Sequence, residues 1–111
     1  MKINRGEVWL IDLNPVVGHE QSGRRPALVV SDDLFNHGPA EMVIVLPITS
    51  TFRGLRTHVE LTGDFLKQKS YIRTEDIRSV SIHRLIKKIG QAEEPVMKAI
   101  EEKLKYLLGF A

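Results

Sequence analysis

Hydrophobic residues along the 111-residue chain occur mostly in short runs that are rich in β-branched side chains and bounded by turn-forming residues, a pattern typical of β-strands. Within these runs apolar positions either alternate with polar ones or fill both faces, as expected for strands covered on one or both sides. The predicted strands cover residues 5–13, 26–31, 42–49 and 58–61, with two shorter ones between residues 70 and 82. Residues 84–90 form a further apolar and basic run that is compatible with a strand.

Polar segments and one proline interrupt this pattern. Residues 32–38 are predicted to form a turn, and residues 50–57, with the sequence STFRGLRT, a basic loop around Gly54. Pro47 lies inside the third predicted strand, and because proline cannot donate to a ladder, we expect a sheet edge, a bulge or a strand end there. Trp9, in the first strand, is expected to belong to the core.

Helical periodicity is confined to the C-terminal segment. After Pro95, apolar residues recur at spacings of three and four as far as Leu107 or Leu108, and Gly109 is a natural helix stop. Five to seven short strands followed by one helix, without βαβ alternation, predict a mainly β fold. We expect a small, strongly bent antiparallel sheet or partly open barrel with a C-terminal α-helix, in a single domain over residues 1–111.

Composition narrows the functional classes. The chain has no cysteine, and its four histidines lack the paired spacing of zinc ligands, so we expect no disulfide, metal site or cofactor. There is no phosphate-binding loop, nucleophile elbow or dinucleotide fingerprint. No long apolar run indicates a signal or a membrane span, and we expect a soluble, cytoplasmic protein. The net charge is only +2, but residues 53–88 carry nine Lys or Arg against four acidic residues, which favours a polyanionic partner.

Candidate chemistry is concentrated between Gly18 and Val30, with the sequence GHEQSGRRPALVV. His19, Glu20 and Gln21 lie in a Gly-bounded loop, and Arg24 and Arg25 follow at the start of a strand. An imidazole, a carboxylate and paired guanidinium groups suit chemistry on a phosphate, because the planar fork of arginine matches phosphate oxygens. The alternative is a solvated hairpin loop with two surface arginines.

Two further polar groups each have a structural alternative. Thr49 and Ser50 end the third predicted strand, where such residues routinely cap a turn. Arg73, Glu75, Asp76 and Arg78 form a dense charged patch, and taken by itself this patch favours a surface salt-bridge cluster of little energetic value.

Taken in order, these segments resemble a known family. The run RGEVWLIDLNPVVGHEQSGRRPALVVS from Arg5 to Ser31, then VLPITS, then IRTEDIRSVSIHRL and a terminal helix, is similar to the MazF/PemK toxin endoribonucleases. The resemblance implies a small SH3-like barrel, a homodimer, and cleavage of single-stranded RNA without metal or cofactor. It also implies a cognate antitoxin whose acidic, partly disordered tail covers the RNA groove, with DNA contacted only through that antitoxin.

The resemblance also implies roles for particular residues. Arg25 and Thr49 match catalytic positions of relatives, and His19 matches an acid/base group of some members. Arg73 and Glu75 match the arginine and acid of the later motif. Asp76 stands where relatives usually have Gln, and Ser79 where they have Thr, which leaves the base preference open.

A mechanism consistent with these residues begins with attack of the RNA 2′-hydroxyl on the adjacent phosphorus, giving a 2′,3′-cyclic phosphate and a 5′-hydroxyl. Arg25 would stabilise the added charge, Arg73 or Arg78 would clamp the phosphate, and either His19 or Glu20 would transfer the proton. Thr49 and Ser50 would hydrogen-bond the phosphate or the 2′-hydroxyl. The expected RNA-binding residues are Glu20, Gln21, Arg24, Ser50, Phe52, Arg53, Arg73, Glu75 and Arg78.

Two other functions stay open from the sequence. A related toxin family with the same fold is not a nuclease and instead binds and poisons DNA topoisomerase, so the fold alone does not settle the activity. A simple RNA-binding barrel would bind the same nucleic acid without cleaving it.

Overall fold

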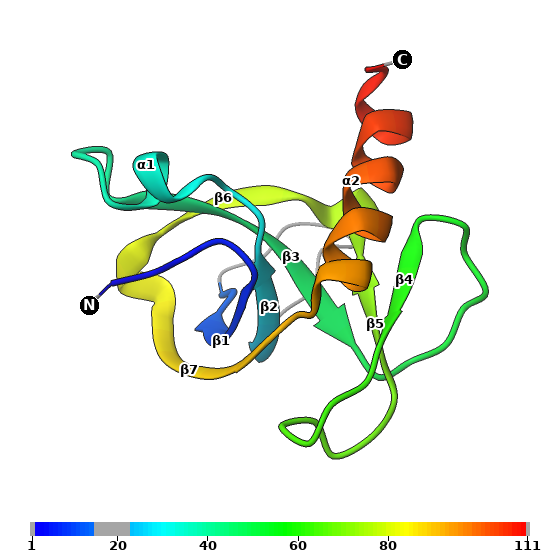
Figure 1. The fold of residues 1–111 in the computed structure, drawn as a ribbon. Helices are drawn as coiled ribbons and strands as arrows, with labels where there is room; N and C mark the ends of the chain where they lie inside the picture. The colour runs from blue at the N-terminus through cyan, green and yellow to red at the C-terminus, as the bar shows by residue number, and fades with distance from the viewer. Residues whose placement is uncertain (1, 15–22, 111) are drawn as a thin grey trace.

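The computed structural model describes residues 2–14 and 23–110. Its described part contains seven strands, two helices and two 3₁₀ turns (Figure 1). The strands are β1 (Glu7–Asp12), β2 (Arg24–Val29), β3 (Met42–Thr49), β4 (His58–Leu61), β5 (Ser70–Arg73), β6 (Arg78–Ser81) and β7 (Leu85–Gln91). The helices are α1 (Asp33–Asn36) and α2 (Glu94–Leu108), and the 3₁₀ turns are η1 (Thr74–Asp76) and η2 (Ile82–Arg84). The predicted mainly β fold with a C-terminal helix is confirmed.

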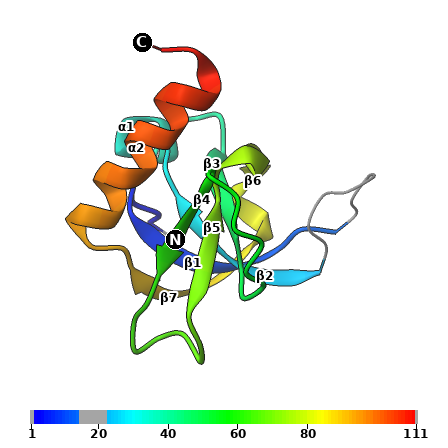
Figure 2. The ribbon, with the colours of Figure 1, turned by 90° about the vertical axis from the view of Figure 1, so that its right-hand side faces the viewer.

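All strand pairs are antiparallel, and they form one bent sheet that does not close. The strand order is β4-β5-β3-β2-β1-β7, and β6 pairs with β3 beside this path. β3 is therefore the central strand, with β2 on one side and both β5 and β6 on the other. Figure 2 shows β4 and β5 side by side, turned away from the β1–β2 part of the sheet.

Pro47 lies neither at an edge nor at a strand end, so two of the three expected positions are wrong. It is buried inside β3, opposite Ala27 of β2. On the other side of β3, the ladder with β6 ends at Val45 and the ladder with β5 begins at Ile48. The missing amide hydrogen thus falls where the partner strand is interrupted by η1, which explains how a central strand accommodates a proline.

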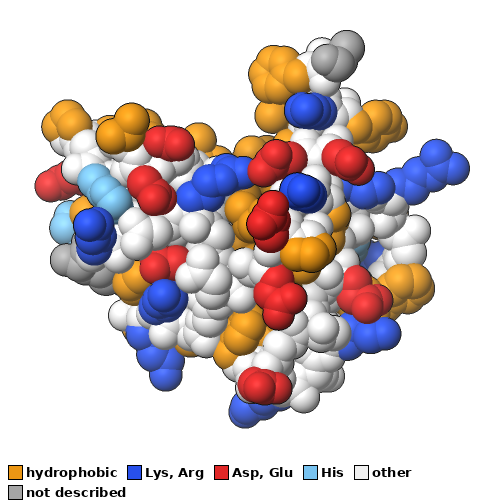
Figure 3. All heavy atoms as spheres, viewed as in Figure 1, with side chains coloured by type: hydrophobic (Ala, Val, Ile, Leu, Met, Phe, Trp, Pro, Cys, Tyr) orange, Lys and Arg blue, Asp and Glu red, His pale blue; other side chains and the backbone are white. Residues whose placement is uncertain are grey.

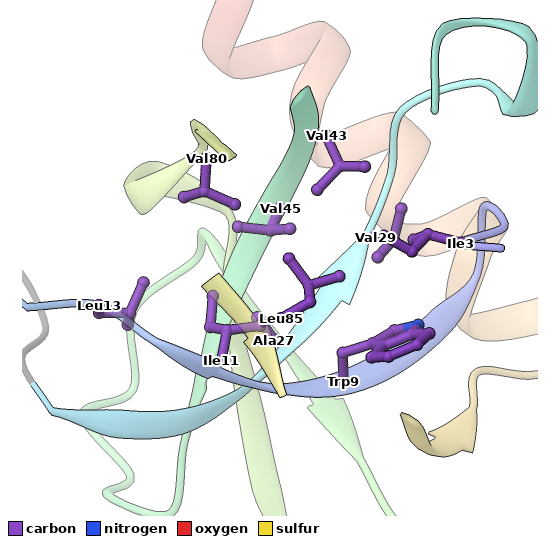
Figure 4. Packing of buried hydrophobic residues seen from close by; sticks show 10 residues of the cluster. All are labelled: Ile3, Trp9, Ile11, Leu13, Ala27, Val29, Val43, Val45, Val80 and Leu85. Carbon is purple, nitrogen blue, oxygen red and sulfur yellow. The ribbon is translucent and has the colours of Figure 1, made fainter. Parts of the chain in front are cut away.

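The bend of the sheet separates two buried hydrophobic clusters. In the first cluster, side chains from five strands point toward one another between the β1–β2 and β3–β6 parts of the sheet (Figure 4). Trp9 belongs to it and is 6% exposed, as predicted. The second cluster lies on the opposite face of β3, where Leu46 and Ile48 pack with Ile100 of α2. Helix α2 therefore covers one face of the sheet and leaves the other to the first cluster.

The predicted element boundaries are close to those observed, with one omission. Residues 32–38 were expected to form a turn, but they contain the single-turn helix α1. Asp32 caps this helix by accepting a hydrogen bond from the Leu34 backbone at 2.9 Å. Helix α2 ends at Gly109, whose φ of 77° is the left-handed conformation that glycine adopts without steric cost. No helix in the described ranges is long and apolar enough to cross a membrane.

A buried carboxylate supports the start of β1. The Glu7 side chain is 7% exposed, and it accepts hydrogen bonds from the Asn4 backbone at 2.8 Å and from Trp9 Nε1 at 3.0 Å. Its other oxygen lies 3.1 Å from Lys88 Nζ of β7. Burial alone would raise the pKa of Glu7, but the bonds from Asn4, Trp9 and Lys88 and the Lys88 charge outweigh it, so the pKa lies below the ordinary 4.5.

Replacing Glu7 by glutamine is expected to lower the free energy of unfolding by about 1–3 kcal/mol at pH 7, because a charged acceptor in a buried network is lost. A carboxyl whose pKa is lowered in the folded state stabilises the protein above pH 4.5, and this contribution is lost as the pH falls through the folded pKa. Urea unfolding at pH 7 and pH 3 should therefore show a larger difference between wild type and variant at pH 7 than at pH 3.

The control is Glu60→Gln, because Glu60 is 57% exposed and pairs with the exposed Lys69 at 3.6 Å. Such a surface pair is expected to contribute less than about 1 kcal/mol. Equal losses for the Glu7 and Glu60 variants at pH 7 would contradict the role given to Glu7.

Candidate active site

The ladder between β2 and β3 brings Arg25 and Thr49 together. Ala27 lies opposite Pro47, and continuing this antiparallel register by two residues places Arg25 opposite Thr49. Residues two apart in a strand point to the same face, so both side chains lie beyond the end of the first hydrophobic cluster. Arg25 is half-buried and Thr49 is 5% exposed. Two residues separated by 24 positions in the chain thus become neighbours through strand pairing.

Both residues line a cavity of about 250 Å³ at this edge of the sheet, together with Ser50. The rest of its lining is largely apolar and comes from the second hydrophobic cluster, with Ile48, Phe65 and Ile89. The connection between β4 and β5 also contributes Lys67 and Gln68. The Thr49 hydroxyl also accepts a hydrogen bond from the Thr51 backbone at 3.1 Å. The predicted turn-capping role of Thr49 is therefore present, and it does not prevent the residue from lining the cavity.

The same face of the sheet continues from β3 onto β5. Tyr71 lies opposite Thr49, and Arg73 follows two residues further along β5 on the same side. The ring of Tyr71 contacts that of Phe52, with centroids 5.3 Å apart and planes inclined by 57°. Phe52 is 68% exposed at the start of the basic loop. An aromatic pair therefore lies on the face of the sheet that carries Thr49, although neither ring lines the cavity.

A network of charged side chains lies at the far end of β5. Glu75 accepts hydrogen bonds from Thr57 Oγ1 at 2.8 Å and from Arg73 Nε at 3.3 Å, and its Oε2 lies 3.0 Å from His58 Nε2. Arg73 also approaches Asp76, with 3.7 Å between the guanidinium nitrogen and Oδ2. The side chains of Arg73 and Glu75 are 17% and 28% exposed. The predicted charged patch is thus a partly buried network rather than a solvated surface cluster.

This network changes the acidity of Glu75. Burial alone would raise the pKa of this carboxyl, but hydrogen bonds from Thr57, the Glu75 backbone and His58, together with the His58 charge, outweigh it and lower the pKa below 4.5. A carboxyl of this kind is ionised at neutral pH and accepts hydrogen bonds on both oxygens. Its geometry suits an anchor for neighbouring donors better than a proton donor to a leaving group.

The remaining predicted site residues fall into two groups. Arg24, Ser50 and Arg53 are exposed at the ends of strands or in the basic loop, and Arg78 is half-buried in β6 opposite Val45. Figure 3 shows Lys and Arg side chains projecting around the β3–β4 loop at its right-hand side. His19, Glu20 and Gln21 lie outside the described residues, so their predicted roles stay predictions.

The structure adds residues that sequence reasoning missed. His58 belongs to the charged network, Lys67 and Gln68 line the cavity, and Tyr71 contacts Phe52. None of these four residues lies in a motif that drew attention. The available signal for Tyr71 was its alternation with Ile72 in a half-buried strand, which placed it on the face opposite the core. No group of three or more His, Cys, Asp or Glu side chains within residues 2–14 and 23–110 is arranged to hold a metal ion.

Comparison with known proteins shows the family to which the chain belongs. Residues 4–108 match the family of PemK-like, MazF-like toxins of type II toxin-antitoxin systems. The chain is 35% identical to endoribonuclease EndoA of Bacillus subtilis, over 97% of this chain and 96% of that protein. It is 32% identical to endoribonuclease PemK of Escherichia coli, over 96% of this chain and 82% of that protein.

Solved structures of this kind superpose closely. MazF of Deinococcus radiodurans gives a TM-score of 0.89 at 30% identity, with 99% of each chain covered. A chain of the MazE–MazF complex from the same bacterium gives 0.83 at 28% identity, covering 100% of this chain and 99% of that one. The fold and the family match together define a small β-sheet toxin. The chain belongs to the PemK-like, MazF-like toxin family of type II toxin-antitoxin systems.

Proposed function

We propose that this toxin endoribonuclease cleaves single-stranded RNA at short specific sequences, without a metal, through attack by the RNA's own 2′-hydroxyl. The observation that carries the proposal is the juxtaposition of Arg25 and Thr49 at one cavity, in a chain of this family. The products are a 2′,3′-cyclic phosphate and a 5′-hydroxyl. This reaction needs charge stabilisation and two proton transfers, which side chains alone can supply.

Arg25 is proposed to stabilise the negative charge that develops on the phosphorane oxygens. Its planar guanidinium stays charged at every working pH and can donate two parallel hydrogen bonds to phosphate oxygens. Because it is half-buried near the start of β2, its charge acts where less water screens it. Thr49 and Ser50 are proposed to hydrogen-bond the phosphate or the 2′-hydroxyl from the facing strand.

The phosphate clamp is proposed to be Arg78 rather than Arg73. Arg73 is already engaged by Glu75 and Asp76. Arg78 makes no ion pair with any residue in the described part of the chain. It lies opposite Val45 of β3, on the face that also carries Thr49, four residues after Val45. Either His19 or Glu20 is proposed to transfer the proton. The other residues proposed to bind RNA are Gln21, Arg24, Phe52, Arg53, Arg73 and Glu75.

The proposed partners are single-stranded RNA and a cognate antitoxin. An acidic, partly disordered antitoxin tail is complementary to the basic segment 53–88 and would cover the RNA groove, with DNA reached only through the antitoxin. A homodimer is proposed because Tyr106, Leu108 and Phe110 leave an exposed apolar surface at the end of α2. The proposed site of action is the cytoplasm, where mRNA is available.

Replacing Phe52 by alanine is expected to weaken RNA binding about 5- to 100-fold, because an unstacked base loses an aromatic platform. Fluorescence anisotropy with a non-cleavable oligonucleotide measures the affinity. The midpoint of thermal unfolding should change little, since Phe52 is 68% exposed. An unchanged affinity would rule out the stacking role.

The proposed function is tested by incubating the purified protein with a long single-stranded RNA in excess EDTA and mapping the cut ends. We expect 5′-hydroxyl ends at recurrent short sequences, because no step of the proposed reaction uses a metal. The absence of cleavage by a folded, antitoxin-free protein would favour an RNA-binding barrel or a topoisomerase poison instead.

A further inference from the structure

We infer that His58 is a positioning residue, which holds the basic loop and Arg73 in place for RNA through its contact with Glu75. This inference rests on the proposed function, because the positioned groups are proposed to bind RNA. His58 is the first residue of β4 and lies directly after the basic loop, residues 50–57. It faces Arg73 across the β4–β5 ladder, so both side chains lie on the face that carries Tyr71 and Thr49.

The His58 ring is buried by its surroundings. Its side chain is 5% exposed, and Nε2 lies 3.0 Å from Glu75 Oε2. The Nδ1 atom is buried and has no hydrogen-bond partner in the described part of the chain. Burying the unpaired Nδ1 atom costs free energy of folding, and an apolar side chain at this position would not carry that cost. The contact with Glu75 is therefore the one polar interaction of the imidazole in the described part of the chain that offsets this cost.

Glu75 joins this ring to two groups that bear on RNA binding. It holds Arg73 through Nε at 3.3 Å and the end of the loop through Thr57 Oγ1 at 2.8 Å. Thr74 adds a second bond to the same end of the loop, from its hydroxyl to the Thr57 carbonyl oxygen. The loop is thus fastened to η1 at one end, while the Thr49 side of the cavity begins at its other end.

Loss of the His58 contact should release both groups. Arg73 would keep Glu75 and Asp76 as partners. The Glu75 carboxylate, which orients Arg73, would however lose its hydrogen bond to the His58 ring. The loop, whose residues 50–56 are exposed, would lose part of its attachment to the sheet. Since ordering a mobile loop on binding costs conformational entropy, the consequence is weaker RNA binding rather than a slower chemical step.

The test compares His58→Ala, His58→Gln and the wild type. In His58→Ala we expect KM for single-stranded RNA to rise about tenfold while kcat changes less than about threefold, as for the loss of one charge-assisted hydrogen bond. Trypsin should also cut faster after Arg53 and Arg56. His58→Gln retains an N–H donor and should restore most of both properties.

Three further variants and measurements keep the outcomes distinct. The matched control is His83→Ala, because His83 is 75% exposed and lies 3.7 Å from Glu41 far from the network. Thr57→Val removes the neighbouring donor to Glu75 and tests the same attachment if His58→Ala does not fold. Circular dichroism establishes folding for each variant.

The inference is overturned if folded His58→Ala retains the wild-type KM and tryptic rate. It is also overturned if His58→Ala and His58→Gln both lose kcat at unchanged KM, because that result would make the imidazole a catalytic group. Failure of the proposed function is recognised separately, since wild-type protein would then not cleave RNA at all while the tryptic rates would still report on the loop.

Discussion

Replacement of Arg25 by alanine is expected to lower kcat for RNA cleavage by about 10²- to 10³-fold, the effect of removing one preorganised donor to a developing negative charge. KM should change much less, because the charge that Arg25 stabilises exists mainly in the transition state. Arg25→Lys keeps the charge but not the planar fork, and we expect it to recover only part of the rate. Single-turnover cleavage of a short RNA containing one mapped site measures these rates.

The control for this experiment is Lys98→Ala, which removes a positive charge from the exposed face of α2. Lys98 is 73% exposed and pairs only with Glu94 of its own helix within the described residues. Its loss should leave the cleavage rate within about twofold, since a surface charge far from the cavity is screened by salt. An Arg25→Ala variant that folds and retains more than a tenth of wild-type kcat would contradict the role of Arg25.

A single 2′-deoxyribose on the 5′ side of the scissile phosphate is expected to abolish cleavage at that site. The proposed nucleophile is the 2′-hydroxyl, and no other group of the substrate can replace it in forming the cyclic phosphate. The modified oligonucleotide should still bind and compete with RNA, because most of its phosphate contacts are unchanged. Gel analysis of end-labelled RNA, with the 2′-deoxyribose moved one nucleotide in either direction as the control, measures this effect.

Two results would contradict this mechanism. Cleavage at the 2′-deoxyribose position at a rate near that of RNA would indicate water as the nucleophile. Loss of cleavage for both control oligonucleotides would indicate that the 2′-hydroxyl groups are read for binding. The first result would leave Arg25 as a charge stabiliser and replace only the nucleophile.

Local sequence patterns located most of the strands in this protein. The bounds of β3 and β4 agree with the predicted residues 42–49 and 58–61, because alternation of apolar and polar residues is a local property of a strand. Helix α2 was equally clear from its apolar spacing and from Gly109. The single turn of α1 was missed, since four residues are too few to show helical periodicity and Asp32 is as typical of a turn as of a helix cap.

The position of Pro47 shows the limit of such patterns. Proline was interpreted as a sign of a sheet edge, a bulge or a strand end, because a regular ladder needs an amide hydrogen that proline lacks. In the structure the central strand changes partner from β6 to β5 at this point. Which strand pairs with which is decided by contacts between distant segments, and these do not appear in any local window.

For the candidate site too, some features follow from the local sequence and others only from the tertiary structure. The sequence by itself determined that Arg25 lies at the start of one apolar strand and Thr49 at the end of the next, and that a charged motif lies near Glu75. Only the tertiary structure decided that the β2–β3 register directs Arg25 and Thr49 to one cavity, and that Glu75 is held by His58, 17 residues away. The physical reason is that a residue's type and strand are set by its local sequence, whereas its partners, burial and acidity depend on how the whole sheet bends.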